Sequence, residues 1–154
     1  MKSLLFYLCF LSLVLGACNT NCGDQICGNG TCDNGKCDCF TGYESAEGGN
    51  CNQEIRQKFL GGWIVNERDN LGNNYSSQIL VDPSPDINQF YIINLVSGTL
   101  VANMISPTSF EVKDQFPVGS NSFVRSTGSG TISGNTVSYT YSYRGYTYSS
   151  QWRK

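Results

Sequence analysis

Seven of the eight cysteines lie between residues 18 and 51, and their spacing constrains the fold more than any other feature of the chain. Six of them follow the pattern C-x4-C-x4-C-x4-C-x-C-x11-C from residue 22 to residue 51, among several glycines. A segment of about thirty residues cannot bury enough apolar surface to fold alone, so covalent crosslinks must replace a hydrophobic core. Six cysteines allow many pairings, and the spacing alone does not choose among them.

The first 17 residues indicate that the chain is exported. Met1-Lys2 precedes an apolar run from Leu4 to Leu15, and two small residues follow at positions 16 and 17. A short basic start, a short apolar stretch and small residues are typical of a secretory signal peptide, whereas a membrane-spanning helix needs about 20 apolar residues. Export places the remaining cysteines in an oxidising compartment, where disulfides persist.

Leu15-Gly16-Ala17-Cys18 resembles the lipobox of bacterial lipoproteins, in which the cysteine thiol receives a diacylglyceryl group and becomes the mature N-terminus. The resemblance implies lipid attachment at Cys18, with the membrane as a partner through two or three acyl chains. Cleavage before Cys18 removes Cys9 and leaves an odd number of cysteines, whereas acylation of Cys18 leaves six that can pair completely. The alternative is ordinary cleavage near Ala17, with Cys18 as a spare or intermolecular thiol.

Cys37 and Cys39, the following run Phe40-Thr41-Gly42-Tyr43 and the final Cys51 resemble an EGF-like module of the short tenascin type. In that family the first cysteine pairs with the third, the second with the fourth and the fifth with the sixth. The resemblance therefore implies the disulfides Cys22–Cys32, Cys27–Cys37 and Cys39–Cys51.

The composition argues against nucleic acid and metal partners. Removing residues 1–17 takes away one of ten basic side chains and leaves nine against twelve acidic ones, with no basic cluster to neutralise a phosphate backbone. No metal or other cofactor is expected, because the chain has no histidine and export disfavours free thiolates. Asn19-Thr20-Asn21 also stands where a calcium-binding EGF-like module carries acidic residues. Abundant Ser, Thr, Asn, Gly and Tyr favour an exported β protein.

After residue 52 the pattern predicts a short helix and then antiparallel strands. Ile55 and Phe59 lie four residues apart and Gly61-Gly62 follows, which predicts two helical turns over 53–60. Alternating apolar runs separated by turn residues predict a mainly β fold, with an antiparallel meander barrel or sandwich of about eight strands. The predicted strands are 63–67, 77–81, 89–96, 99–105, 109–113, 122–125, 128–133, 136–144 and 146–153. The predicted organisation is a signal peptide (1–17), a lipidated tether (18–21), an EGF-like module (22–51) and a β domain (52–154).

Two short turns, Gly134-Asn135 and Arg144-Gly145, fix the expected register of the last three strands, because such loops join adjacent antiparallel strands. This register places Gly130 opposite Tyr139 and Gly128 opposite Tyr141. Side chains alternate between faces, so one face collects the large apolar residues and the other collects Ser, Thr and Gln. The apolar face comprises Ile132, Val137, Tyr139, Tyr141, Tyr143, Tyr146, Tyr148 and Trp152.

The aromatic face has two interpretations. One is a buried β core, because a Tyr or Trp ring buries roughly 150 to 250 Å². The other makes part of the face a stacking platform for sugar rings or for an apolar ligand. The candidate ligand or core aromatics are Trp63, Tyr139, Tyr141, Tyr143, Tyr148 and Trp152.

The start and end of the β domain carry a further resemblance. Phe59-Leu60-Gly61-Gly62-Trp63 and the final basic residue Arg153 resemble the lipocalin and calycin pattern of a Gly-x-Trp start with a basic residue over the indole. The resemblance implies that Arg153 closes the barrel through a cation–π contact. The run from Gly128 to Val137 is similar to the C-terminal β domains of small Bacteroidetes lipoproteins, a family without an assigned activity.

Catalysis would need a nucleophile with a base, paired carboxylates or a metal. Histidine is absent and the thiols are expected to be paired, so we expect no enzyme. Six carboxylates lie near predicted strand ends or loops, and the sequence does not show whether two of them converge as in a glycosidase. They are Glu67, Asp69, Asp82, Asp86, Glu111 and Asp114.

The sequence therefore predicts a lipid-anchored cell-envelope protein with a non-enzymatic binding or structural role. Asn19 is not the aspartate that resembles an inner-membrane retention signal, which favours the outer membrane. The candidate partners besides the membrane are a carbohydrate, a protein or a small apolar ligand, and no nucleic acid is expected. A lipocalin-like carrier of a small amphiphile is the alternative, and a hydrolase is the third interpretation.

Overall fold

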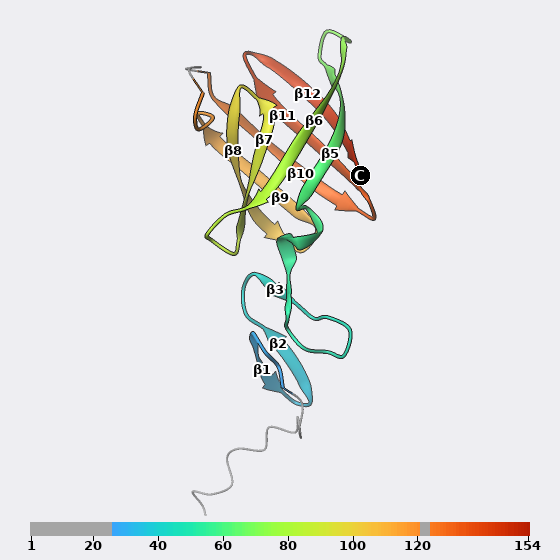
Figure 1. The fold of residues 1–154 in the computed structure, drawn as a ribbon, viewed down its shortest axis with the longest axis vertical. Coiled ribbons are helices and arrows are strands. Elements are labelled where there is room, and N and C mark those ends of the chain that lie inside the picture. Colours follow the sequence, from blue (N-terminus) through green and yellow to red (C-terminus); the bar gives the residue numbers. More distant parts are fainter. Residues whose placement is uncertain (1–25, 121–123) are drawn as a thin grey trace, which may run out of the picture. The chain divides into compact units, whose positions relative to one another are not determined.

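The structure is a computed structural model that describes residues 26–120 and 124–154. The described chain forms two compact units, residues 26–40 with 45–52 and residues 41–44 with 53–154 (Figure 1). The predicted signal peptide, the lipid-attachment residue Cys18 and Cys22 lie outside the described residues.

The first unit contains a β-hairpin. β1 (Gly30–Asp33) pairs antiparallel with β2 (Lys36–Cys39). The turn residues Asn34 and Gly35 have φ angles of 48° and 80°. Positive φ at both positions belongs to a type I′ turn, for which Asn-Gly is a preferred sequence. The turn residues therefore set the register of this hairpin.

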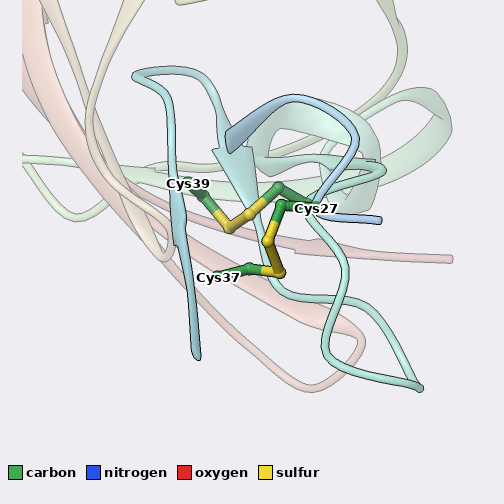
Figure 2. Close-up of a disulfide and its surroundings, with 4 residues drawn as sticks. Cys27, Cys37 and Cys39 are labelled. Carbon is green, nitrogen blue, oxygen red and sulfur yellow. A yellow bond between two sulfur atoms is a disulfide. The ribbon is translucent and has the colours of Figure 1, made fainter. Parts of the chain in front are cut away.

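Disulfides Cys27–Cys37 and Cys39–Cys51 crosslink this unit (Figure 2). They are two of the three pairs that the EGF-like resemblance implies. Cys32 is also disulfide-bonded, and its expected partner lies outside the described residues. The N–H of Cys51 donates to the carbonyl of Cys27 at 3.0 Å, and Cys51 is fully buried. Covalent crosslinks at the centre of the unit therefore take the place of a hydrophobic core.

The second unit is a closed antiparallel barrel of eight strands. The paired strands β3 (Tyr43–Glu44) and β4 (Gln53–Glu54) and the 3-10 helix η1 (Ile55–Lys58) belong to this unit as well. The barrel strands are β5 (Gly61–Asp69), β6 (Asn74–Pro83), β7 (Gln89–Val96), β8 (Gly98–Ser106), β9 (Ser109–Gln115), β10 (Ser126–Ser133), β11 (Thr136–Tyr143) and β12 (Tyr146–Arg153). Consecutive strands pair, and β12 pairs with β5 to close the barrel. The prediction of a mainly β fold with an antiparallel meander barrel is confirmed.

Two predicted elements are wrong in part. The helix predicted over 53–60 is reduced to the single turn of η1, because Gln53 and Glu54 pair with β3 and the N–H of Ile55 donates to the carbonyl of Gly42. The strand predicted over 122–125 is absent at Val124 and Arg125, whereas residues 121–123 are outside the described ranges. The Arg125 guanidinium donates to Asp114 and lies over the Phe116 ring.

The register predicted for the last three strands is confirmed. Gly128 pairs with Tyr141 and Gly130 with Tyr139 across the first turn, and Tyr141 pairs with Tyr148 across the second. The predicted apolar face points into the barrel, where Val137, Tyr139, Tyr141 and Trp152 are at most 3% exposed. Tyr146 departs from this pattern: it is the first residue of β12, directly after the turn, and is 40% exposed.

Aromatic rings fill the end of the barrel next to η1, which we call the closed end and define by Phe59, Trp63, Phe90, Phe110 and Trp152. All five are at most 2% exposed. Phe110 is central, with ring centroids at 5.1 Å from Phe90, 5.5 Å from Phe59 and 5.9 Å from Trp152. The indole N–H of Trp63 donates to the carbonyl of Phe59 at 2.7 Å, which satisfies its one polar atom.

Two basic side chains, Arg56 and Lys154, make contacts around the closed end of the barrel. The buried guanidinium of Arg56 donates to the carbonyls of Ser84, Asp86 and Gln89, so it ties η1 to the β6–β7 connection. The cation over the Trp63 ring is Lys154, at 4.7 Å from the centroid, and not the predicted Arg153. Residue 153 follows the inward-pointing residue 152, so strand alternation turns its side chain outward.

Packing at the closed end depends on a glycine. A Cβ added to Gly130 would lie 2.3 Å from Cζ of the Phe110 ring. Gly130 is also opposite Tyr139, whose ring stacks on Phe110 at 5.3 Å. The glycine therefore leaves the space that the Phe110 ring occupies.

We predict that Gly130→Ala destabilises the barrel by about 1 to 3 kcal/mol, because the new methyl group overpacks the closed end. The control is Gly62→Ala, since a Cβ there meets nothing within 4 Å. We expect the control to change the stability by less than about 0.5 kcal/mol. Urea unfolding followed by tryptophan fluorescence measures both, and equal stability of the two variants would contradict the packing argument.

Candidate functional site

A cavity of about 520 Å³ opens at the end of the barrel away from η1. We call it the mouth cavity. Its lining includes Glu67, Tyr75, Ser77, Tyr141, Tyr143, Tyr148 and the segment 94–98. A volume of this size is typical of small-molecule sites.

Strand alternation explains how the cavity receives its residues. On β5, the inward side chains are Trp63 and Val65 near the closed end and then Glu67 and Asp69 near the mouth. The same alternation on β11 and β12 directs several tyrosines inward. The strands therefore change from apolar to polar inward residues as they approach the mouth.

An irregularity between β7 and β8 shapes one wall of the cavity. The pairing of these strands shifts register, and Asn94 and Gly98 have φ angles of 70° and 137°. Consecutive residues Leu95 and Val96 are both buried, which regular alternation would not allow. The irregularity therefore brings backbone and apolar groups of one segment to the same cavity.

Three tyrosines form a stack that runs from the core to the cavity. The rings of Tyr139 and Tyr141 are 5.1 Å apart with an interplanar angle of 12°, and those of Tyr141 and Tyr148 are 4.9 Å apart with an angle of 14°. Tyr75 and Tyr146 contact the outer ring of the stack, at 6.2 and 6.4 Å from Tyr148. The aromatic core is thus continuous with the aromatic lining of the cavity.

Glu67 is the charged residue that lines the cavity. Its Oε1 accepts a hydrogen bond from the Tyr141 hydroxyl at 2.9 Å, and no Lys or Arg of the described residues forms an ion pair with it. Burial raises the pKa of the Glu67 carboxyl, and the bond from Tyr141 offsets this only in part. Burial and the charge of Glu67 raise the pKa of Tyr139 and Tyr141, so both phenols stay neutral.

Asp69 has a different environment two residues further along the same strand. Its carboxylate accepts hydrogen bonds from the N–H groups of Leu71 and Asn73, from the Asn73 amide and from the Tyr75 hydroxyl. These bonds, led by that from the Asn73 side chain, lower the pKa of Asp69. Asp69 therefore holds the β5–β6 turn and the Tyr75 ring in place, whereas Glu67 keeps acceptor capacity for a ligand.

The structure separates the sequence-predicted residues into two groups. Tyr141, Tyr143 and Tyr148 line the cavity, whereas Trp63 and Trp152 are buried at the closed end. Tyr139 is buried beneath the cavity lining. Five of the six candidate carboxylates, Asp69, Asp82, Asp86, Glu111 and Asp114, do not line the mouth cavity.

Sequence reasoning missed Tyr75 and the segment 94–98. The strand that contains Tyr75 was predicted to begin at residue 77, although Tyr75 has the same alternation as Ser77, Ile79 and Val81. Extending that strand by one pair would have placed Tyr75 on the same face of β6 as Ser77, where it lines the cavity although it is 47% exposed. The irregularity at 94–98 leaves no signal in the alternation pattern.

Within the described ranges, no three or more His, Cys, Asp or Glu side chains are grouped so that they could bind a metal ion. No helix in these ranges is both long enough and apolar enough to span a membrane.

Two tyrosine variants test the hydrogen bonding at the site. Tyr141→Phe should lower the free energy of unfolding by about 1 to 2 kcal/mol, because it removes a hydrogen bond to a carboxylate. Tyr139→Phe should lower the free energy of unfolding by less than about 0.5 kcal/mol or raise it, because the Tyr139 hydroxyl is buried without a partner among the described residues. Urea unfolding measures both. Equal losses would contradict the assigned hydrogen bonding.

No protein-family model matches the chain, and no curated protein matches it. The fold is similar to the solved structure of a redesigned beta barrel, with a TM-score of 0.53 and 14% sequence identity. The match covers 65% of this chain and 94% of that barrel. At this level of identity, the likeness establishes the closed barrel fold alone.

Proposed function

We propose that this chain is an exported, lipid-anchored envelope protein whose barrel binds a small ligand in the mouth cavity without catalysing a reaction. The observation that carries the proposal is the division of the barrel interior. Aromatic side chains fill the closed end, and a cavity lined by tyrosines and one carboxylate remains at the other end. The lining combines four tyrosines with the Glu67 carboxylate and further polar groups, and convergent polar groups beside aromatic rings are typical of small-molecule sites.

The signal peptide and lipobox support the anchored location, with Cys18 as the acylated residue and the outer membrane as the preferred site. Only Asn19, Thr20 and Asn21 separate Cys18 from Cys22, and three residues reach at most about 11 Å. The EGF-like module would therefore begin close to the lipid surface. Disulfides Cys27–Cys37 and Cys39–Cys51 agree with that module type.

A carrier of a small amphiphile is the second candidate, and the closed barrel with both apolar and polar groups lining its mouth favours it. The filled closed end limits this candidate, because Phe59, Phe90 and Phe110 occupy the space that an extended acyl chain would need. A carried molecule would have to fit within the mouth cavity.

A blocked cavity tests ligand binding. Ser77→Phe places a ring in the cavity lining, and Ser76→Phe places the same ring on the opposite face of β6 as the control. A thermal-shift screen of chemically varied small molecules should find compounds that raise the Tm of the wild-type protein and of the control but not that of Ser77→Phe. Compounds that stabilise all three proteins equally would show that the mouth cavity is not the site.

The intact mass of the protein purified from bacterial membranes tests the anchor. We predict a chain that begins at Cys18, carries two or three acyl chains and lacks six hydrogens because of three disulfides. Its thiols should react with an alkylating reagent only after reduction. An unacylated chain with one thiol that reacts before reduction would contradict the anchor, and Cys18→Ser is the control that should lose the acyl mass.

A further inference from the structure

We infer that the ligand of the mouth cavity carries a positively charged nitrogen, an organic ammonium group held between tyrosine rings and the carboxylate of Glu67. This inference rests on the proposed function, since it names the ligand class for the same cavity.

The charge of the cavity favours a cationic ligand. Glu67 is half-buried, and it receives one hydrogen bond from a neutral phenol and no ion pair from a Lys or Arg of the described residues. A partly buried carboxylate without a cation is unfavourable, because the single bond from Tyr141 replaces only part of the hydration that it has lost. A ligand cation would supply the missing charge, whereas an anionic ligand would add repulsion.

The aromatic lining of the cavity also favours a cation. Tyr75, Tyr143 and Tyr148 line the same cavity as Glu67, and the faces of aromatic rings attract cations. Tyr143 already shows this behaviour at the rim, where the guanidinium of Arg144 lies 5.3 Å from its ring centroid. Rings and carboxylate together favour a cation over a neutral molecule of the same shape.

The charged side chains Asp69 and Arg144, which lie near Glu67 or the rim, do not line the cavity. The carboxylate oxygens of Asp69 accept hydrogen bonds from the β5–β6 turn and from Tyr75. Glu67 is therefore the acidic group that faces the cavity. Arg144 belongs to the β11–β12 turn and is not part of the lining. Ser77 and Asn94 add polar groups for the rest of a ligand.

Choline and 3,3-dimethylbutan-1-ol provide a test, because they have nearly the same shape and differ in whether the central atom is N⁺ or carbon. Binding to the purified mature protein in a non-ionic detergent is measured by calorimetry. Choline should bind about tenfold more tightly than the neutral alcohol. Equal affinities of the two probes would overturn the inference.

Glu67→Gln should weaken choline binding by about tenfold and leave the affinity for the alcohol unchanged. Glu111→Gln is the matched control, because Glu111 is a half-exposed carboxylate that does not line the mouth cavity. Urea unfolding of both variants shows that they are folded. Unchanged choline affinity in Glu67→Gln would overturn the inference.

The outcomes also separate this inference from the proposed function. If compounds bind in a manner that Ser77→Phe abolishes but choline does not bind, the ammonium inference fails and ligand binding in the mouth stands. If no compound binds, both fail. Glycerophosphoethanolamine and ethanolamine distinguish the source of the ammonium group, since tighter binding of the first indicates a lipid head group and tighter binding of the second a free amine.

Discussion

The contact between the Phe110 ring and the backbone of Gly130 determines which end of the barrel interior is filled by side chains. The ring lies where a side chain at position 130 would be, and it contacts Phe59, Phe90 and Tyr139 at centroid distances of 5.1 to 5.5 Å. Close packing of this kind leaves no room for a ligand at the closed end. The aromatic packing continues through the stack of Tyr139, Tyr141 and Tyr148 to the mouth, where the cavity opens.

The last two inward positions of β5 carry acidic residues, and the different surroundings of these residues give them different pKa shifts and roles. Glu67 and Asp69 are neighbours on the same face of β5. Asp69 has four hydrogen-bond donors from the adjoining turn and from Tyr75, which lower its pKa, whereas burial raises the pKa of Glu67. The first carboxylate is part of the scaffold, and the second remains available to a ligand.

Much of the barrel is predictable from local patterns. The turns at 134–135 and 144–145 fixed the pairing of β10, β11 and β12, because two-residue loops and alternating side chains leave one register. The cavity was less predictable. The sequence pattern gives Trp152 and Tyr148 the same position on the aromatic face, although Trp152 is buried and Tyr148 lines the cavity. The pattern does not show this difference, because it depends on packing against Phe110 from another strand.

The same limit applies to the contacts that close the barrel. The resemblance to the calycin pattern implied a cation over Trp63 but assigned it to Arg153 instead of Lys154. No sequence pattern predicts the role of Arg56, because its guanidinium binds backbone carbonyls of residues about thirty positions further along the chain. Such contacts become visible only once the strands are assembled.

Nuclear magnetic resonance of the labelled protein during a choline titration tests the central claim most directly. The account predicts shifts in the side-chain signals of Glu67, Tyr141 and Tyr148 at the mouth. The indole N–H signals of Trp63 and Trp152 at the closed end, which donate to Phe59 and Ser150, should stay unchanged. Shifts confined to the indole signals or to the outer face of the barrel would contradict it.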